Sequence, residues 1–524
     1  MAETYDVVVA GAGHNSLIAA CYLAKAGYEV CVLEARPIVG GDTATEELTL
    51  PGFRHDSCST AHVLIQASPT ISGDELGLIA DYGLEYLYPE IAVHVPFLDG
   101  TWLTQYTERE RTWEEFAKFS RRDADAYLRM MDDYHEARAA FGAARYTPVG
   151  YGPGLEALLR DRPDGARWLR RSAMSAWDVI RHEFEDWHTR GFMLWMAAQT
   201  VQPVERPGTG PLAYSIAYGR QQHGWTIPRG GSGALPAACV RLLEEHGATI
   251  LTSKPVGSLV LENGRCTGVE TEDGERYLAR HAVLSTIHVK HLVDMAPADA
   301  WGDDFRFGVE TWKAGVTLFV THYATTEPPR FPVDGGHVEA VAMGTGLPPQ
   351  RHLDVGPDFE RGALNLDDPP LLVVCPSVED PSRAPHGRHT LKVIGYQPYD
   401  LADGGPERWD EVKDEVSRAN LEMLRRYAPN LTDDTILASV VKSPLDLERQ
   451  NRHNWHGSCH GGDLSPAQSG SLRPAPGWAS HRLPIPGLYQ TGATTHPGGS
   501  VSAGPGRNAA MVLLDDLGRG LIGA

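Results

Sequence analysis

A short glycine-rich turn near the start of the chain has the residue types and the spacing that hold a phosphorylated cofactor. It follows the apolar run TYDVVVA and consists of Gly11, Ala12, Gly13, His14, Asn15 and Ser16. The first glycine permits a tight turn, and the second lets a pyrophosphate group approach the N-terminus of the helix that follows. The third position is usually Gly or Ala, and Ser16 is small enough to serve there. The turn is therefore a G-x-G-x-x-S variant of the dinucleotide-binding fingerprint.

The residues that follow indicate which dinucleotide is bound. Glu34 stands 23 residues after Gly11, where its carboxylate can accept hydrogen bonds from an adenosine ribose. A glycine pair shortly after this acid is typical of FAD-binding proteins similar to glutathione reductase and the amine oxidases, so we predict FAD rather than NAD. The residues concerned are Ala35, Arg36, Gly40, Gly41, Asp42 and Thr43. Because Asp42 stands where many such proteins have arginine, a phosphate contact is expected from Arg36, Thr43 or the backbone.

Three secondary-structure elements are needed to position this turn, and the sequence predicts each of them. Residues 5–10 are an apolar, β-branched run that suits a buried parallel strand. Residues 17–26 form an alanine-rich helix that Gly27 ends, and residues 29–33 form the next strand. This strand-turn-helix-strand unit predicts the α/β class, with a Rossmann-type FAD-binding domain of the glutathione-reductase/amine-oxidase kind.

A second glycine-rich loop lies near the other end of the chain. The segment GLYQTGATTHPGGSVSAGPGRNAA, residues 487–510, begins as a buried strand and ends in an apolar helix that starts near Pro505. Loops of this composition let the backbone press against a flat or phosphorylated group. We therefore expect this loop to contact a cofactor as well.

The segment WTIPRGGSGALPAACVRLL, at residues 225–243, has two interpretations. It could be a second, NADP-binding Rossmann turn, with Ser253 and Lys254 placed to meet a 2′-phosphate. Against this, the GSGALP stretch lacks the third small residue of the fingerprint, and the strand before it is short and ends in proline. We favour the alternative, in which the chain re-enters the first domain and the backbone near Val256 closes over the adenine.

The other segments predict a second, mixed α+β domain. Residues 91–106 alternate around Asp99-Gly100 as a hairpin, and residues 112–141 have helical periodicity. The stretch GFMLWMAAQTV is more apolar and is expected in a core or pocket wall. Further strands are predicted at VTLFVTHY, LLVVC and HTLKVIGY, and a helix at RWDEVKDEVSRANLEMLRRYAP. The predicted division is an FAD-binding domain at 1–75, 224–300 and 480–524, and a discontinuous substrate domain at 76–223 and 301–479.

Charge and composition exclude some classes of function. The chain of 524 residues is too long to fold around one hydrophobic core of ordinary size, so more than one domain-sized unit is expected. With 47 basic and 68 acidic residues, the net charge of −21 argues against a nucleic-acid partner, which requires a basic surface. The sequence has no apolar run of the roughly 20 residues that a membrane span needs, and its immediate entry into a strand leaves no room for a signal peptide. We expect a cytoplasmic protein and leave open a peripheral contact with a membrane.

The cysteines and histidines do not predict a metal site. The seven cysteines are scattered along the chain and include no C-x-x-C pair. This distribution is typical of reduced thiols in a cytosolic protein. His456, Cys459 and His460 cluster in WHGSCHGG, but a second paired cluster is missing. We therefore predict that no metal is bound.

Five stretches spread over most of the chain have a family likeness. They are AGAGHNSLIAACYLAKAGYEVCVLEARPIVGGDTATEE, FLDGTWLTQYTERERTWEEFAKFSRRDADAY, WTIPRGGSGALPAA, the run from DLERQN to GGDLSPAQSGSLRPAPGW, and IPGLYQTGATTHPGGSVSAGPGRNAA. Together they resemble the phytoene-desaturase-like FAD oxidoreductases, which include carotenoid desaturases, carotenoid ketolases and retinol saturases. The THPGG segment before a C-terminal helix is the most specific part.

This resemblance implies that the C-terminal loop lies along the ribityl chain and isoalloxazine of FAD. The helix after it would face the pyrimidine end of the flavin, where its dipole stabilises negative charge on the reduced ring. The implied contacts are Gly492, Ala493, Ser502 and Gly504. Many FAD proteins have an acid after this first glycine; here Ala493 is followed by two threonines, whose hydroxyls or backbone amides are expected to bind the ribityl hydroxyls. Because the loop contains no cysteine, the FAD is expected to be non-covalent.

The resemblance implies an FAD-dependent oxidoreductase of the desaturase or dehydrogenase type. Such an enzyme moves a hydride between a mostly apolar small molecule and flavin N5. The electron acceptor stays open among oxygen, a quinone and NAD(P). Candidate catalytic groups are His62, after the first FAD block, and His496, in the THPGG loop, because either could face the isoalloxazine.

Three alternatives stay open at this point. A flavin amine oxidase would share the architecture, but such enzymes place an aromatic side chain from the C-terminal loop before the flavin, and residues 491–508 contain none. An oxygen-using ketolase or hydroxylase is not separable from a desaturase by sequence. A non-catalytic flavin-binding interaction protein would keep the FAD contacts and lose an open pocket.

Overall fold

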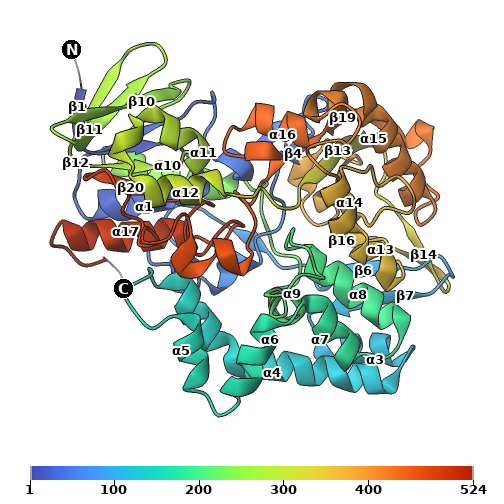
Figure 1. Ribbon diagram of the computed structural model, residues 1–524. Coiled ribbons are helices and arrows are strands. Elements are labelled where there is room, and N and C mark those ends of the chain that lie inside the picture. Colours follow the sequence, from blue (N-terminus) through green and yellow to red (C-terminus); the bar gives the residue numbers. More distant parts are fainter. Residues whose placement is uncertain (1–2, 522–524) are drawn as a thin grey trace.

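Two β-sheets organise the chain, and each takes strands from distant parts of the sequence (Figure 1). The computed structural model describes residues 3–521. The first sheet has the order β10-β11-β12-β1-β2-β9, and β20 pairs with the end of β12. Its strands are β1 (Glu3–Ala10), β2 (Val30–Leu33), β9 (Thr249–Leu251), β10 (Val256–Glu262), β11 (Arg265–Thr271), β12 (Arg276–Ser285) and β20 (Leu488–Gln490).

The first sheet is parallel where the two ends of the chain meet. β1 pairs in parallel with β2 and with β12, and β20 extends the parallel set beside β12. β9 pairs in parallel with β2, with Cys31 opposite Thr249. The segment after residues 225–243 therefore returns to the first sheet. This confirms the interpretation in which the chain re-enters the first domain and not the one in which it forms a second Rossmann turn.

Helices cover one face of this sheet because their small and apolar side chains face it. They are α1 (His14–Lys25), α10 (Ala234–Glu245) and α17 (Gly504–Asp516), which share one core with Val7, Val9, Val30 and Val32. A separate core on the other face contains Val8 and Leu33 together with Phe305 and Val309 of α12 (Asp303–Glu310). The packing beneath this sheet therefore continues past residue 300. The predicted division into domains stays a prediction.

The second sheet has the order β19-β13-β18-β17-β16-β6-β7. Its strands are β6 (Ile91–Pro96), β7 (Trp102–Tyr106), β13 (Leu318–Thr325), β16 (Ala342–Gly344), β17 (Leu372–Val374), β18 (His389–Tyr396) and β19 (Ile436–Lys442). The predicted hairpin around Asp99-Gly100 is confirmed as the antiparallel pair β6 and β7. Three short pairs complete the strands: β3 (Thr45–Glu47) with β4 (Arg54–Asp56), β5 (Tyr86–Leu87) with β8 (Ile227–Pro228), and β14 (Phe331–Val333) with β15 (Gly336–Val338).

A helical layer packs on the second sheet through a core rich in aromatic side chains, below the sheets in Figure 1. Its helices are α3 (Arg109–Ala117), α4 (Arg121–Tyr146), α5 (Leu155–Arg160), α6 (Gly165–Ala173), α7 (Ala176–Glu183), α8 (Trp187–Ala198) and α9 (Leu212–His223). The predicted helix at 112–141 is two helices, because the Ser120 side chain accepts a hydrogen bond from the Asp123 N–H and begins α4. In the GFMLWMAAQTV stretch, Phe192 to Ala197 lie in α8 and in the core, and the last three residues, 199–201, follow the helix and line the cavity.

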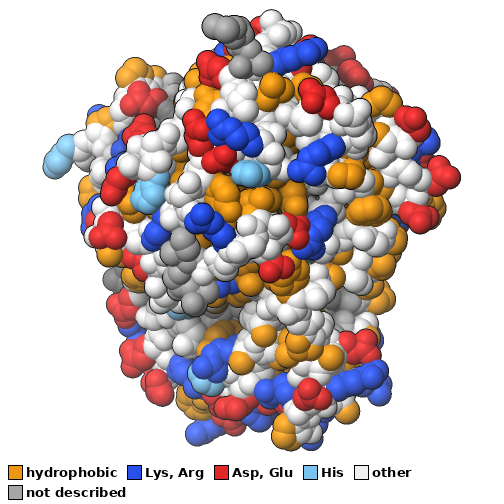
Figure 2. Space-filling model, turned by 90° about the vertical axis from the view of Figure 1, so that its left-hand side faces the viewer, with side chains coloured by type: hydrophobic (Ala, Val, Ile, Leu, Met, Phe, Trp, Pro, Cys, Tyr) orange, Lys and Arg blue, Asp and Glu red, His pale blue; other side chains and the backbone are white. Residues whose placement is uncertain are grey.

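The other face of the second sheet carries the remaining long helix, α15 (Trp409–Arg425), through Met423 and Leu424. The shorter helices are α2 (Pro69–Ser72), α11 (Val289–Leu292), α13 (Pro349–Leu353), α14 (Val355–Arg361) and α16 (Pro444–Gln450). None of the described helices is long and apolar enough to cross a bilayer. Figure 2 shows the side of the molecule at the left of Figure 1, where acidic and basic side chains are interspersed among hydrophobic ones.

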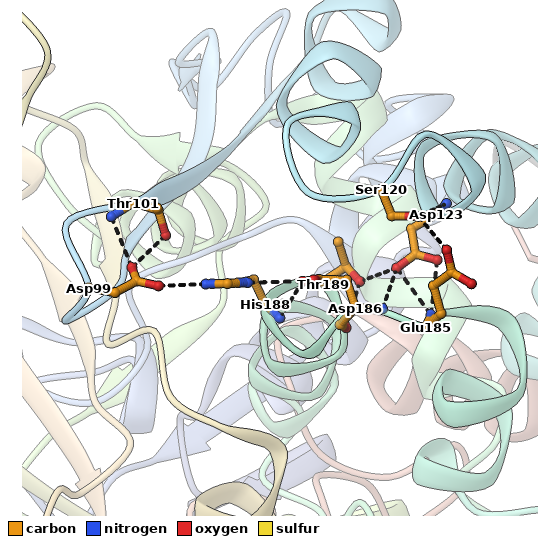
Figure 3. Close-up of polar contacts among 8 residues, drawn as sticks. All are labelled: Asp99, Thr101, Ser120, Asp123, Glu185, Asp186, His188 and Thr189. Atoms are coloured by element: carbon orange, nitrogen blue, oxygen red, sulfur yellow. Dashed lines mark hydrogen bonds and ion pairs between the residues drawn. The ribbon is translucent and has the colours of Figure 1, made fainter.

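A buried carboxylate joins α4 to the start of α8 (Figure 3). The Asp123 carboxylate accepts hydrogen bonds from the backbone N–H groups of Glu185 and Asp186, both at 2.9 Å, and from the Thr189 hydroxyl at 2.5 Å. These N–H groups belong to the turn that begins α8 and have no helical acceptor. We expect Asp123→Ala to lower the free energy of unfolding by about 1 to 3 kcal/mol, because it removes the acceptor of these N–H groups and of the buried Thr189 hydroxyl.

Urea unfolding followed by far-ultraviolet circular dichroism measures this loss. The control is Asp132→Ala in the same helix, whose carboxylate is 63% exposed and pairs only with Arg109. That change is expected to cost at most about 1 kcal/mol. Equal losses in the two variants would contradict the role given to Asp123.

Candidate cofactor and substrate site

A cavity of about 850 Å³ runs between the two sheets and takes lining residues from both. Its volume is within the range of cofactor and substrate pockets. One end is lined by the first glycine turn, the end of β2 and the start of β10. The other end is lined by α9 and by β13, β17 and β18 of the second sheet. The cavity therefore extends from the predicted cofactor site to the second sheet and α9.

Glu34 closes the end of β2 and faces the cavity. Its two carboxylate oxygens accept hydrogen bonds from the backbone N–H groups of Ala12 and Arg36, each at 2.8 Å. Burial raises the pKa of the Glu34 carboxyl, while these N–H groups act in the opposite direction. The first turn thus fixes the acid beside its own backbone, where a ribose can be bound.

The first turn has the shape of a cradle for a phosphorylated group. Gly11 has φ +100°, and a Cβ there would stand 2.3 Å from Cγ2 of Thr286, so only glycine fits. A Cβ on Gly13 would meet nothing within 4 Å, because it would enter the cavity. Two lining residues beside them, His14 and Asn15, have buried polar atoms without a protein partner, Nε2 and Oδ1. These features fit the pyrophosphate of a dinucleotide.

The glycine pair lies against the first turn. Gly40 donates its N–H to the carbonyl of Ala12 at 2.8 Å, and Gly41 lines the cavity. Asp42 also lines it, and one oxygen of its carboxylate accepts hydrogen bonds from the side-chain amides of Asn451 and Asn454, both at 3.0 Å. This acid therefore binds the loop after α16.

At the adenine end, Ala35, Arg36 and Val256 line the cavity as predicted. The Arg36 guanidinium pairs with Glu46 at 2.8 Å. Lys254, which the NADP interpretation assigned to a 2′-phosphate, forms an ion pair with Asp273 at 2.8 Å. Its ammonium group therefore already has a partner.

The C-terminal loop meets the same cavity, as a site held from both ends of the chain requires. Gly492 and Ala493 line it, together with Gly499, Ser500 and Val501. Gly492 has φ +93°, and a Cβ there would stand 2.5 Å from Oγ1 of Thr286, the residue that also packs on Gly11. Both glycine-rich turns therefore approach one threonine at the end of β12.

Some predicted site residues support the cavity without lining it. They are Ala12, Ser16, Gly40, Thr43, Ser502, Gly504, His62 and His496. The Ser16 hydroxyl donates to the carbonyl of Gly11 at 2.7 Å, and the Thr43 hydroxyl donates to that of Gly40 at 2.7 Å. These two side chains hold the turns in shape, so a phosphate contact from the Thr43 hydroxyl is not supported.

The two histidines predicted as catalytic groups make contacts elsewhere. The ring nitrogens of His62 lie 3.3 Å from the Tyr86 hydroxyl and 2.9 Å from the Ser232 hydroxyl, and Nε2 of His496 lies 2.8 Å from the carbonyl of Ala144. Neither side chain lines the cavity. Their catalytic role stays a prediction without support from the structure.

Burial lowers the pKa of His62 to about 3, from an ordinary value of 6.5. Between pH 6.5 and pH 3 the His62 side chain is protonated in the unfolded chain and neutral in the folded chain. The free energy of unfolding therefore decreases as the pH falls, by about 1.4 kcal/mol per pH unit for this one group. Between pH 7 and pH 5 we expect the free energy of unfolding of His62→Gln, measured in urea, to fall by about 2 kcal/mol less than that of the parent. The exposed His386→Gln is the control, and equal pH dependence in all three proteins would contradict the assignment.

Several lining residues were missed from sequence. They include the loop Asn451, Arg452 and His453, the segment from Thr286 to His288, and the pair Cys459 and His460. Cys459 and His460 belong to the WHGSCHGG segment, which the sequence analysis considered only as a metal site. In the structure they line the cavity. The glycine-poor 451–453 loop has no such signal.

The wall farthest from the first turn is apolar and comes from three neighbouring strands and one helix. Leu318 on β13 lies opposite Tyr396 on β18, and Leu372 on β17 lies opposite Ile394 on β18. Leu212, Ile216 and Trp225, from α9 and the segment after it, complete what we call the apolar wall: Leu212, Ile216, Trp225, Leu318, Leu372, Ile394 and Tyr396.

Comparison with known proteins identifies the family. The model described as flavin containing amine oxidoreductase matches residues 17–505, which is most of the chain. The chain belongs to this family. It is an FAD-dependent oxidoreductase of the desaturase and dehydrogenase type. That its FAD is non-covalent stays a prediction. The cradle at Gly13 and the unpartnered atoms of His14 and Asn15 fit that cofactor.

Individual proteins are similar to this chain over nearly its full length. Pyridine nucleotide-disulfide oxidoreductase domain-containing protein 2 of Mus musculus is 28% identical, over 98% of this chain and 94% of its own. One of the limonene dehydrogenase subunits of Castellaniella defragrans is 26% identical, over 98% and 95%. The lycopene-forming phytoene desaturase of Pantoea ananas is 26% identical, over 97% and 99%, and confirms the resemblance drawn from sequence.

A solved structure confirms the fold. A triple mutant of putrescine oxidase has a TM-score of 0.64 and 16% identity, over 99% of this chain and 100% of its own. The predicted α/β class, with an FAD-binding domain of the amine-oxidase kind, is thus confirmed.

Proposed function

We propose that this oxidoreductase removes a hydride from a C–H bond of a mostly apolar small molecule that lies on the apolar wall. The observation that supports it best is the continuity of one cavity from the first glycine turn to that wall. A molecule seated there would lie between the second sheet and the C-terminal loop.

Each part of the cavity has a task in this proposal. FAD, when bound, supplies hydride acceptance, and the protein orients the partner. The side chains of Leu318, Leu372 and Ile394 displace water and bind carbon chains through apolar contact. The backbone at Gly492 and Ala493, which lines the same cavity, would hold the cofactor.

Named relatives support an apolar substrate. The limonene dehydrogenase and the phytoene desaturase are named for hydrocarbons. Both share the full length of this chain at about a quarter identity, a level at which pocket residues differ. The substrate itself is therefore proposed from this chain's own wall.

Amine oxidation is less well supported than hydrocarbon oxidation. Arg220 is 5% exposed and lines the cavity beside Trp225. A protonated amine beside that guanidinium would be repelled, because two like charges in a poorly hydrated site raise each other's energy. The acidic lining residues are Glu34 after β2, Asp42 in the short helical turn 41–43, Glu272 after β11 and Asp294 after α11, and none of these four is on the second sheet or on α9.

Anaerobic mixing of the FAD-loaded protein with limonene, a carotenoid precursor, a retinol-like alcohol and a primary amine tests the proposal. We expect bleaching of the flavin absorbance by an apolar compound and none by the amine. Bleaching by the amine alone would overturn it. A flavin that no compound bleaches, although dithionite does, would favour the non-catalytic alternative. Oxygen, a quinone and NAD(P)+ are then compared as agents that restore the absorbance.

A further inference from the structure

Arg220 is a buried cation that faces the cavity. It is on α9, one turn after Ile216, on the helix side that also carries Leu212 and Ser215 to the cavity. Its guanidinium lies 4.2 Å from the centre of the Trp225 ring and 5.7 Å from that of Trp195.

The guanidinium has few partners for a group so deeply buried. Within residues 3–521, no carboxylate lies within 4.0 Å of it. The hydrogen bond recorded for the side chain runs from Nη1 to Sδ of Met196, at 2.8 Å, and a thioether is a weak acceptor. Burial lowers the pKa of Arg220 to about 9, and the Tyr396 side chain opposes this fall.

A cation with so little compensation is costly to bury. The faces of Trp225 and Trp195 offset part of that cost through cation–π attraction. The remaining N–H donors, five in an arginine less the one directed at Met196, lack a protein acceptor in the described chain. Arg171 shows the contrast: it too lies over aromatic rings, those of Trp168 and Tyr214, but it pairs with Asp133 at 2.8 Å.

From this geometry we propose that Arg220 binds a carboxylate of the substrate, so that the substrate is an apolar molecule with one acidic group. This inference rests on the proposed function and specifies its substrate class. A carboxylate matches the planar fork of a guanidinium with two parallel hydrogen bonds. The carbon skeleton would extend along the apolar wall, from Arg220 toward the cofactor end.

The charge of the site favours a carboxylate over a phosphorylated head. The one positive charge of Arg220 balances one carboxylate, while a phosphate monoester carries more negative charge than that. The other arginines that line the cavity outside the predicted cofactor contacts are on other elements. Arg145 on α4 is partly buried, and Arg449 and Arg452, at the end of α16 and just after it, pair with Asp410 and Glu272.

Binding of matched probes to the FAD-loaded protein tests this assignment. The probes are oleate and methyl oleate, geranate and methyl geranate, and geranyl phosphate, each titrated by calorimetry. We expect each acid to bind roughly tenfold or more tightly than its ester, and geranate more tightly than geranyl phosphate. Tightest binding of the phosphate would overturn the carboxylate assignment.

Arg220→Met, Arg220→Gln and Arg220→Lys separate a ligand role from a structural one. If the guanidinium binds a carboxylate, the Met and Gln variants lose the preference for acid over ester, and the Lys variant keeps part of it. The ligand-free thermal midpoint of Arg220→Met should be unchanged or higher, because the variant removes an uncompensated buried charge. The control, Arg171→Met, should lower the midpoint, because it leaves Asp133 without its partner.

The outcomes distinguish this inference from the proposed function. If apolar compounds bleach the flavin but acids and esters bind equally to the parent, the Arg220 assignment fails and the proposed function stands. A lower midpoint in Arg220→Met, with the acid preference retained in Arg220→Gln, would also overturn it. If neither acids nor esters bind to protein that retains its FAD, the apolar-substrate proposal fails with it.

Discussion

Gly13→Val is expected to yield a folded protein that has lost most of its FAD. The backbone at Gly13 has φ −70° and ψ 161°, a conformation that valine adopts without strain. The new side chain would enter the cavity where the cofactor's phosphates approach the start of α1. Overpacking costs about 1 to 3 kcal/mol, so we expect FAD to bind roughly 5- to 150-fold more weakly.

Flavin absorbance per mole of purified protein, followed by titration of the apoprotein with FAD, measures the effect. Gly142→Val in α4 is the matched control, because a Cβ there also meets nothing within 4 Å but lies away from the cavity. The control should keep its flavin. Full FAD content in Gly13→Val would show that the cofactor does not lie against the first turn.

Arg383→Met is expected to cause the largest loss of stability. The Arg383 side chain has no exposed surface, and its guanidinium lies 2.9 Å from Oδ1 of Asp56. The same oxygen accepts hydrogen bonds from the Thr45 hydroxyl at 2.7 Å and from the Ser232 N–H at 2.8 Å. Removing the cation leaves a buried carboxylate with less compensation, which costs about 3 to 5 kcal/mol.

The shift in the midpoint of urea unfolding, monitored by tryptophan fluorescence, measures this loss. Arg160→Met is the control, because its ion pair with Glu156 is exposed on both sides and is expected to contribute at most about 1 kcal/mol. The double variant Asp56→Asn/Arg383→Met should recover part of the loss, since both charges are then absent. Equal midpoints for Arg383→Met and Arg160→Met would contradict the role of this pair.

Prediction from sequence succeeded where function depends on local spacing. The turn from Gly11 to Ser16, the acid at Glu34 and the strand-helix-strand unit around them lie within a single βαβ unit. Their geometry follows from backbone rules that any chain of this pattern obeys. The return of the 225–243 segment to the first sheet also followed locally, from the incomplete fingerprint.

The sequence left open the roles that depend on what packs around a side chain. His62 and His496 were selected for their residue type and their position after cofactor motifs; in the structure His62 contacts Ser232 and His496 contacts the carbonyl of Ala144, and their catalytic role stays a prediction. The break between α3 and α4 was missed because the charged, helix-periodic pattern continues through Ser120, whose side chain begins a new helix.

The sequence by itself determined the cofactor and the fold class, because short motifs set backbone geometry and backbone geometry sets how a phosphate is approached. The meeting of the two glycine-rich ends was implied by the family resemblance, and in the structure both ends line one cavity. Only the tertiary structure decided the apolar wall and the position of Arg220. These residues are distributed over α9 and three strands separated by long stretches of sequence, and in the sequence Arg220 looks like an ordinary surface charge. Its burial, and the chemistry that burial implies, arises when those strands close over it.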